Sequence, residues 1–200
     1  MTGLLIKIKH SFPLLWNVVE FVNGSIMRIR YPKLHKIASK IILSSRHLNF
    51  EWSPVTYADI QNLSHFLTSI PNNRLQHFNP HKFDIDTLKS MLSNHSFIMM
   101  KVTDGNSIIG YHFLRCFFIG KAFHGLIVDD NYGGKGIGTK MWSIATNICN
   151  EAGIRMFATI SENNQPSLNS CRKGCNATIV KQLSDSYLLI ACHPHSDITK

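Results

Sequence analysis

The chain has 200 residues and a mass of 22.7 kDa, with 44% hydrophobic and 16% charged residues. This length suits one domain with a full core, or one domain plus an appendage, and the composition excludes an intrinsically disordered chain. The longest uncharged apolar runs are too short to cross a bilayer, and no signal-peptide cleavage site follows them. Five cysteines without a CxxC pair indicate a reducing compartment, so we expect a cytoplasmic protein.

The net charge of +9 is concentrated near the N-terminus. Residues 1–50 hold eight Lys or Arg and one acidic residue, Glu20, and so carry seven of the nine net charges. The rest of the chain is nearly balanced, which argues against a nucleic-acid partner and favours a boundary near Asn49. We therefore expect a basic helical extension, residues 1–48, followed by a main domain, residues 49–200.

The extension is predicted to contain two helices separated at Asn23-Gly24-Ser25. The first follows Pro13, and the second covers roughly residues 33–43. Two interpretations stay open. The pair packs on the main domain with solvated charges, or it forms an amphipathic, Trp16-bearing surface that associates weakly with an anionic membrane or an acidic partner through residues 1–48. The membrane version predicts a peripheral location at the inner face of the membrane.

From residue 50 onwards, strand and helix patterns alternate. The first half is predicted to hold a strand, two helices, a hairpin and a further strand, at 50–53, 57–67, 84–92, 96–102 with 107–118, and 122–128. The second half is predicted to hold a helix, a strand, a short helix and two closing strands, at 138–152, 155–160, 165–173, 178–181 and 187–191. Antiparallel strands followed by a βαβα order imply a mixed, twisted α/β sheet with helices on both faces.

The stretch LIVDDNYGGKGIGTK, from Leu126 to Lys140, runs from a strand through four glycines into a helix. Glycine lets backbone N–H groups turn inward and lets a ligand approach closely, and a helix N-terminus adds unsatisfied donors. The loop is therefore predicted to bind a phosphate. A Walker loop needs Lys directly after its last glycine, and a Rossmann loop needs G-x-G-x-x-G, but neither order is present.

Over residues 50–192 the chain resembles the GNAT superfamily of acyl-CoA-dependent N-acyltransferases, whose loop Arg/Gln-x-x-Gly-x-Gly/Ala binds the pyrophosphate of coenzyme A. Gly136 and Gly138 match the two glycines, and Gly133 stands at the Arg/Gln position. A second family motif opens at Asn164 and Ser167, which are also expected at the cofactor. The resemblance implies that coenzyme A contacts the strand end and the loop, namely Leu126, Ile127, Val128, Gly133, Gly134, Lys135, Gly136, Ile137, Gly138 and Thr139.

The resemblance implies a GNAT-like sheet and direct transfer of an acetyl group from acetyl-CoA to the amine of a small molecule, such as an amino sugar. In the family, backbone N–H groups, here near Ile127 and Val128, polarise the thioester carbonyl. A helix tyrosine often protonates the thiolate, and Cys171 stands at its position, as a catalytic donor or as an inert buried cysteine. The alternative function is a drifted GNAT domain that binds acyl-CoA or a partner without turnover.

Histidines are the candidate bases, because their ordinary pKa suits proton transfer near neutral pH. His124 comes first, since it shares its strand parity with Leu126 and Val128. We also expect acceptor contacts from three other histidines, His77, His81 and His112. Cys192 with His193 and His195 hints at a metal, but no fourth ligand is evident, so no metal site is predicted. The sequence leaves open whether the protein forms a homodimer.

Overall fold

The computed structural model describes residues 13–195, so residues 1–12 of the predicted membrane-binding segment, and the side chain of Trp16, lie outside the description. Its helices are α2 (Pro13–Arg30), α3 (Leu34–Ser44), α4 (Ile60–Thr68), α5 (Asn72–Leu75), α6 (Ile85–Ser93), α7 (Ile137–Glu151) and α8 (Gln165–Gly174). Its strands are β1 (Glu51–Pro54), β2 (Phe97–Asp104), β3 (Ser107–Phe117), β4 (Lys121–Val128), β5 (Arg155–Ser161), β6 (Asn176–Gln182) and β7 (Tyr187–His193). Among residues 13–195, no helix has the length and hydropathy needed to cross a bilayer.

Seven strands form one sheet in the order β1-β2-β3-β4-β5-β7-β6. Every neighbouring pair is antiparallel except β4 and β5, which are parallel. The parallel pair is joined by α7, as a crossover between parallel strands requires. The predicted mixed α/β sheet with an antiparallel first half is thus confirmed.

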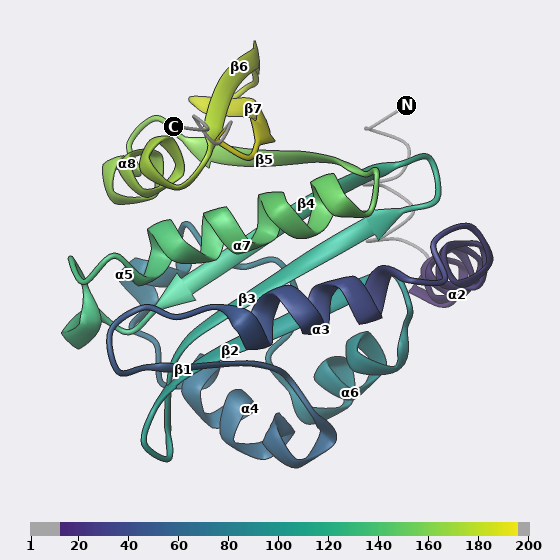
Figure 1. The fold of residues 1–200 in the computed structure, drawn as a ribbon, viewed down its shortest axis with the longest axis horizontal. Helices are drawn as coiled ribbons and strands as arrows, with labels where there is room; N and C mark the ends of the chain where they lie inside the picture. Colours follow the sequence, from purple (N-terminus) through teal and green to yellow (C-terminus); the bar gives the residue numbers. More distant parts are fainter. Residues whose placement is uncertain (1–12, 196–200) are drawn as a thin grey trace.

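Helices cover both faces of the sheet. On one face α7 and α3 lie side by side, and α4 and α6 cover the opposite face (Figure 1). Each face has its own cluster of buried apolar side chains. Along β4, Leu126 and Val128 pack into the cluster under α7, whereas Ile127 belongs to the cluster under α4. This alternation means that neighbouring residues of β4 serve different faces of the molecule.

The predicted break at Asn23-Gly24-Ser25 is wrong, because α2 continues through these residues. Asn23 is buried, and its side-chain N–H donates to the carbonyl of Cys116 at the end of β3, over 2.9 Å. Gly24 allows a close approach, since a Cβ there would lie 2.2 Å from Oδ1 of Asn94. The small and polar residues that suggested a turn therefore pack α2 against the end of the sheet.

The extension shares the core of the main domain. Leu34, Ala38 and Ile42 of α3 are buried in the same cluster as Trp142 of α7. The lysines at 33, 36 and 40 are exposed on the outer side of this segment. In the described residues the helices are therefore packed on the main domain with solvated charges. The boundary at residue 48 separates a basic segment from a nearly neutral one, but residues on both sides of it belong to the same hydrophobic core.

Candidate active site

β4 and β5 are paired only over their first three residues. The paired positions are Lys121 with Arg155, Ala122 with Met156, and Phe123 with Phe157. β4 nevertheless continues to Val128 and β5 to Ser161, so the two parallel strands part beyond Phe123. From residue 124 onwards, one edge of β4 has no neighbouring strand among residues 13–195. Such an edge in the middle of a sheet offers backbone donors and acceptors to a ligand.

The open edge of β4 presents the backbone groups of Leu126 and Val128. The N–H of Asp129 donates to the carbonyl of Ile109 on β3, over 2.9 Å. Because backbone direction alternates along a strand, Ile127 also faces β3, whereas Leu126 and Val128 face the opening. The predicted pair of donors near Ile127 and Val128 is therefore corrected to Leu126 and Val128.

The glycine-rich loop follows β4 and ends at the N-terminus of α7. Gly134 and Gly136 have φ angles of +74° and +77°, a region that favours glycine. The first backbone bond of α7 runs from the N–H of Lys140 to the carbonyl of Gly136, over 3.0 Å. The N–H groups before that bond have no partner within the helix and can bind an anion, and they belong to Ile137, Gly138 and Thr139.

Two other predicted loop residues have different surroundings. The N–H of Gly133 donates to the carbonyl of Asp130 over 3.0 Å, so it closes a turn inside the loop. The ammonium of Lys135 lies 4.4 Å from the centre of the Tyr132 ring, a cation–π contact. Gly133 therefore offers no free N–H to a ligand, whereas Lys135 brings positive charge to the loop.

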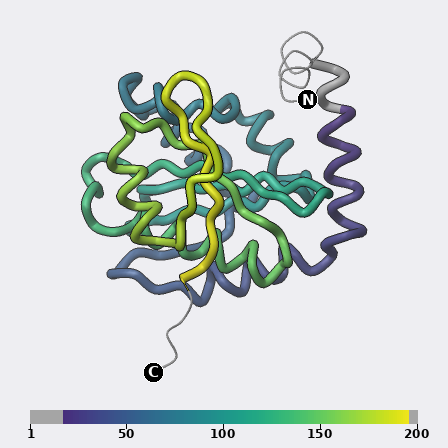
Figure 2. The backbone as a smooth tube through the Cα atoms, turned by 90° about the horizontal axis from the view of Figure 1, so that it is seen from above, coloured from purple at the N-terminus to yellow at the C-terminus, as the bar shows by residue number. Residues whose placement is uncertain are grey.

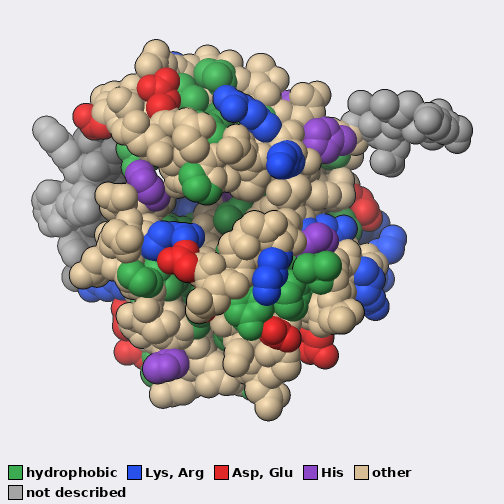
Figure 3. All heavy atoms as spheres, turned by 90° about the vertical axis from the view of Figure 1, so that its left-hand side faces the viewer, with side chains coloured by type: hydrophobic (Ala, Val, Ile, Leu, Met, Phe, Trp, Pro, Cys, Tyr) green, Lys and Arg blue, Asp and Glu red, His purple; other side chains and the backbone are tan. Residues whose placement is uncertain are grey.

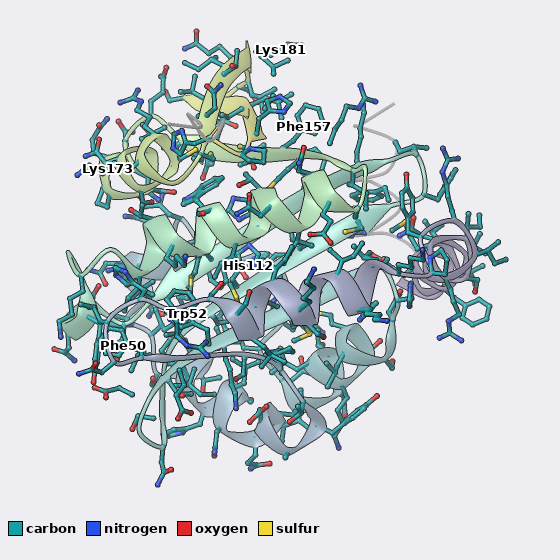
Figure 4. All side chains as sticks on the ribbon, viewed as in Figure 1. Phe50, Trp52, His112, Phe157, Lys173 and Lys181 are labelled. Atoms are coloured by element: carbon teal, nitrogen blue, oxygen red, sulfur yellow. The ribbon has the colours of Figure 1, made fainter. Side chains whose placement is uncertain are left out.

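A residue of the extension that sequence reasoning missed also contacts the loop. Nε2 of His47 lies 2.6 Å from the carbonyl oxygen of Lys135, and a Cβ on Gly136 would lie 3.0 Å from the same nitrogen. The His47 ring packs edge-on against Trp52, which lies below the start of α7 together with Phe50 (Figure 4). Since His47 and Lys135 are 88 positions apart, no local pattern could have revealed this contact.

The second motif begins α8 as predicted. The side-chain oxygen of Asn164 accepts from the N–H of Ser167 over 3.2 Å, which is an N-cap. Further along α8, Ser170 accepts from the indole N–H of Trp142 over 3.2 Å. Gly174 permits close packing, because a Cβ there would lie 2.4 Å from the carbonyl oxygen of Thr139. These contacts hold α8 against the N-terminal half of α7.

Cys171, at the tyrosine position of the family, is 1% exposed, and its Sγ lies 3.8 Å from Sγ of Cys175. The hydrogen bond with Cys175 is the main cause that raises the pKa of the Cys171 thiol. A buried thiol with a raised pKa is a poor proton donor to a leaving thiolate. This environment favours the inert buried cysteine among the two interpretations.

His112 is buried beneath α7 (Figure 4), and its ring partner His124 is partly buried. Nε2 of His112 lies 3.1 Å from Nδ1 of His124, and the His124 ring centre lies 3.9 Å from that of Trp142. Burial lowers the pKa of His112 to about 3 and holds the pKa of His124 well below its ordinary value. A histidine with so low a pKa is a weak base at neutral pH. These surroundings argue against the predicted role of His124 as the base.

His81 lies on the opposite face, among aromatic side chains. Its Nδ1 is 2.7 Å from the carbonyl oxygen of Lys82, so Nδ1 donates and Nε2 carries the lone pair of the neutral ring. Nε2 lies 3.4 Å from the hydroxyl of Tyr111, and the ring centre is 5.3 Å from that of Phe113. Gly125 of β4 touches Phe113, since a Cβ on this glycine would lie 2.6 Å from Cε1 of that ring. These contacts connect His81 to the parted strand.

The predicted set of acceptor histidines is therefore divided. His112 lies under α7 and His81 under the opposite layer, so the sheet separates the two side chains. His77 is exposed on the same loop as His81. The predicted grouping of His112 with the other two is wrong, because residues 111 and 112 of β3 point to opposite faces.

Arg74 is a second residue that the sequence did not suggest. It lies on α5, a short helix that was not predicted, and forms an ion pair with Asp130 of the glycine-rich loop. Its Nη2 also lies 3.4 Å from the carbonyl oxygen of Val128. Figure 3 shows this end of the molecule, where charged and His side chains surround a shallow hollow. Arg74 thus joins the segment that bears His81 to the loop at the end of β4.

Residues 60–176 match the model of the Acetyltransferase (GNAT) family. The chain belongs to this GNAT family. The match spans the parted strands, the glycine-rich loop and α8, and it confirms the family resemblance drawn from the loop. A search among curated proteins finds no relative.

Solved structures of GNAT proteins share the fold. The GNAT domain of PAT from S. lividans aligns with a TM-score of 0.59 and 15% identity, over 70% of this chain and 88% of that domain. PaiA N-acetyltransferase from Thermoplasma acidophilum, in complex with coenzyme A, aligns with a TM-score of 0.58 and 15% identity, over 72% of this chain and 98% of that chain. AAC(6')-Ib, in complex with coenzyme A and kanamycin, aligns with a TM-score of 0.57 and 14% identity, over 74% of this chain and 95% of that chain. At these identities the similarity shows the fold, and the GNAT-like architecture is confirmed.

Proposed function

We propose that this GNAT protein transfers the acetyl group of acetyl-CoA to the amine of a small molecule. The observation that carries the proposal is the parting of β4 from β5 beside the free N–H groups at the start of α7. Two structures of the same fold support it, since one contains coenzyme A and the other coenzyme A with the aminoglycoside kanamycin.

The residues around the opening fit coenzyme A. The N–H groups of residues 137–139 would hold its pyrophosphate, with Lys135 adding positive charge and His47 supporting the loop from behind. The open backbone of Leu126 and Val128 would pair with the amides of the pantetheine arm. The cradle requires glycine at 136, because a side chain there would meet the His47 ring and strain a left-handed backbone.

Bound acetyl-CoA supplies the acetyl group as a thioester that an amine can attack. The N–H groups on the open edge of β4 would donate to the carbonyl oxygen as negative charge develops on it. We assign the removal of the amine proton to Nε2 of His81, which carries a lone pair and lies on the side of the acceptor loop. The rings of Phe78, Tyr111 and Phe113 would keep water from the reacting atoms.

The alternative, cofactor binding without turnover, draws support from Cys171, whose surroundings make it a poor proton donor. Release of thiol from acetyl-CoA in the presence of an amine panel separates the two functions. The panel includes amino sugars, an aminoglycoside and polyamines, and mass spectrometry identifies the acetylated product. We expect turnover with at least one amine. Tight coenzyme A binding with no thiol release from any amine would favour the alternative.

Cofactor binding is tested by replacing Gly136 with valine. The side chain would strain the left-handed backbone at the loop, so we expect coenzyme A binding to be lost in calorimetry. Gly153→Val is the matched control, since Gly153 also has a positive φ, of +69°, but lies beyond α7 with open space around it. Equal affinities of the two folded variants for coenzyme A would overturn the assignment of the loop.

We also propose that the outer face of α2 contacts anionic membranes. Val18, Phe21, Val22 and Ile29 are 56%, 73%, 46% and 82% exposed, at helical spacing along one side. Arg28 and Arg30 flank this stripe, and α2 lies along one edge of the molecule (Figure 2). Basic residues beside an apolar stripe suit an interfacial helix.

Sedimentation with vesicles tests this contact. A Phe21→Glu/Ile29→Glu variant should lose salt-sensitive binding to vesicles that contain phosphatidylserine, whereas a control variant of an exposed apolar residue of β6, Val180→Glu, should keep it. Point variants are preferable to removal of residues 1–48, because α3 contributes to the core. Negligible binding of the unaltered chain at low salt would refute the proposal.

A further inference from the structure

Three of the five cysteines converge where α8 ends. Cys171 lies in α8, Cys175 is the extended residue directly after the helix, and Cys192 comes from β7. Their Sγ atoms all lie within 4.8 Å of one another, and the residues are 1%, 1% and 3% exposed. The thiols are not joined in a disulfide.

The spacing of the sulfur atoms suits a tetrahedral metal ion. A Zn–S bond of about 2.3 Å and a tetrahedral angle place two sulfur ligands roughly 3.8 Å apart. The Sγ atoms of Cys171 and Cys175 are 3.8 Å apart. A disulfide would instead require a separation of about 2.05 Å. Cys171 and Cys175 are therefore already spaced as ligands of one ion.

The group of ligand atoms within 4.8 Å of one another holds the three sulfur atoms alone, so a fourth ligand has to come from a nearby segment, and we assign it to His195, which follows β7. Nε2 of His195 lies 3.2 Å from the carbonyl oxygen of Lys173, in the last turn of α8 and two positions before Cys175. Since a carbonyl only accepts, Nε2 carries the proton and Nδ1 keeps its lone pair. A histidine that donates one ring N–H to a backbone carbonyl while the other nitrogen binds metal is the usual arrangement of metal-binding histidines.

We propose that Cys171, Cys175 and Cys192, with Nδ1 of His195, bind one Zn²⁺ ion. The site ties the end of α8 to β7, and one of its ligands, Cys171, stands at the tyrosine position of the family motif. The sequence did not predict it, because the Cys-x-x-x-Cys pair and Cys192 are far apart along the chain and the ligands meet only when β7 folds beside α8. The thiolates and the imidazole match the ligand types that zinc prefers.

Titration with Co²⁺ tests the site in the full chain, after reduction and removal of metal with a chelator. We expect one equivalent to give the absorption bands of tetrahedral cobalt bound to thiolates, and Zn²⁺ to displace it. Cys192→Ala should abolish these bands, and His195→Ala should weaken metal binding at least about 10-fold. Cys116→Ala and His193→Ala are matched controls and should bind as the unaltered chain does, since Cys116 is buried elsewhere in the core.

A second measurement does not depend on the variants folding. Zn²⁺ should raise the unfolding temperature of the unaltered metal-free chain, whereas Mg²⁺ should not, because only an ion bound by the folded state stabilises it. Absence of thiolate-to-cobalt bands in the unaltered chain, or their persistence in folded Cys192→Ala, would overturn the site. Unchanged affinity in His195→Ala would overturn the fourth ligand.

Discussion

Histidines lie on both faces of the sheet beside β3 and β4, and their surroundings differ. Beneath α7, His112 and His124 bond to each other and are covered by the ring of Trp142. On the other face, His81 comes from a loop, is half-buried, and holds its Nδ1 on a backbone carbonyl. The carbonyl of Lys82 fixes the tautomer of His81, whose Nε2 lies 3.4 Å from the Tyr111 hydroxyl at the rim of the packed layers.

The difference teaches that strand parity is a weak guide to catalysis. Residues of one parity along β4 share a face, but the helix that packs on that face decides whether they meet a ligand or the core. α7 packs on His124 through the ring of Trp142, and the loss of solvation there lowers the pKa of His124 well below its ordinary value. A loop residue such as His81 is not covered by a helix in this way, because loops carry their side chains at the rim of the packed layers.

The largest effect is expected for His81→Ala. If its Nε2 takes the proton from the amine, kcat should fall by ~100-fold or more, while affinity for coenzyme A stays the same. The matched control is His77→Ala, which removes an exposed histidine from the same loop and should retain turnover. Steady-state kinetics with the amine found in the panel measures both. Equal kcat for the two variants across pH 6–9 would remove His81 from the mechanism.

For His124→Ala we expect the opposite pattern, a loss of stability with little change in turnover. The change leaves His112 without its ring partner and empties space beneath Trp142, so the free energy of unfolding should fall by about 1–3 kcal/mol. Turnover of the folded fraction should change little. Urea unfolding followed by fluorescence gives the first quantity, and kinetics at a temperature where the variant is folded gives the second. A large loss of kcat without loss of stability would restore His124 as the base.

The free energy of unfolding should also depend on pH, with a gradual change per pH unit. An unfolded histidine titrates near pH 6.5, whereas burial lowers the pKa of His112 to about 3. Between these values the unfolded chain binds a proton that the folded chain does not, so the free energy of unfolding decreases as the pH falls from about 6.5 towards 3. The slope is at most ~1.4 kcal/mol per pH unit for one histidine. His112→Phe should flatten this slope, and His77→Ala should not. Identical slopes in the unaltered chain and His112→Phe would show that His112 does not stay neutral when folded.

Local patterns predicted the elements that build the site. Alternation and turn residues located β2, β3 and β4, and the glycines before residue 137 located the start of α7. The helix starts near residues 84 and 165 were also predicted, and there the side chains of Asp84 and Asn164 each accept from an N–H three residues on. These features depend on neighbours within one turn or one hairpin, and a single sequence shows them.

What the sequence could not show depends on contacts between distant segments. His47 reaches the loop from the extension, and Arg74 reaches the end of β4 from a short helix. Asn23 and Gly24 looked like a turn because their partners lie on other elements. The directions of the β4 backbone groups required the pairing with β3 to be known. In each case, tertiary packing assigned a role that the local pattern leaves undetermined.

Amide hydrogen exchange with and without coenzyme A tests the central claim most directly. Coenzyme A should slow exchange at Leu126 and Val128 on the open edge of β4, and at residues 137–139 at the start of α7. Ile127, whose N–H faces β3, should be unaffected and serves as an internal control within the same strand. Slowed exchange at 126, 128 and 137–139 is the predicted result. Binding of coenzyme A that leaves the exchange of all five amides unchanged would contradict the account.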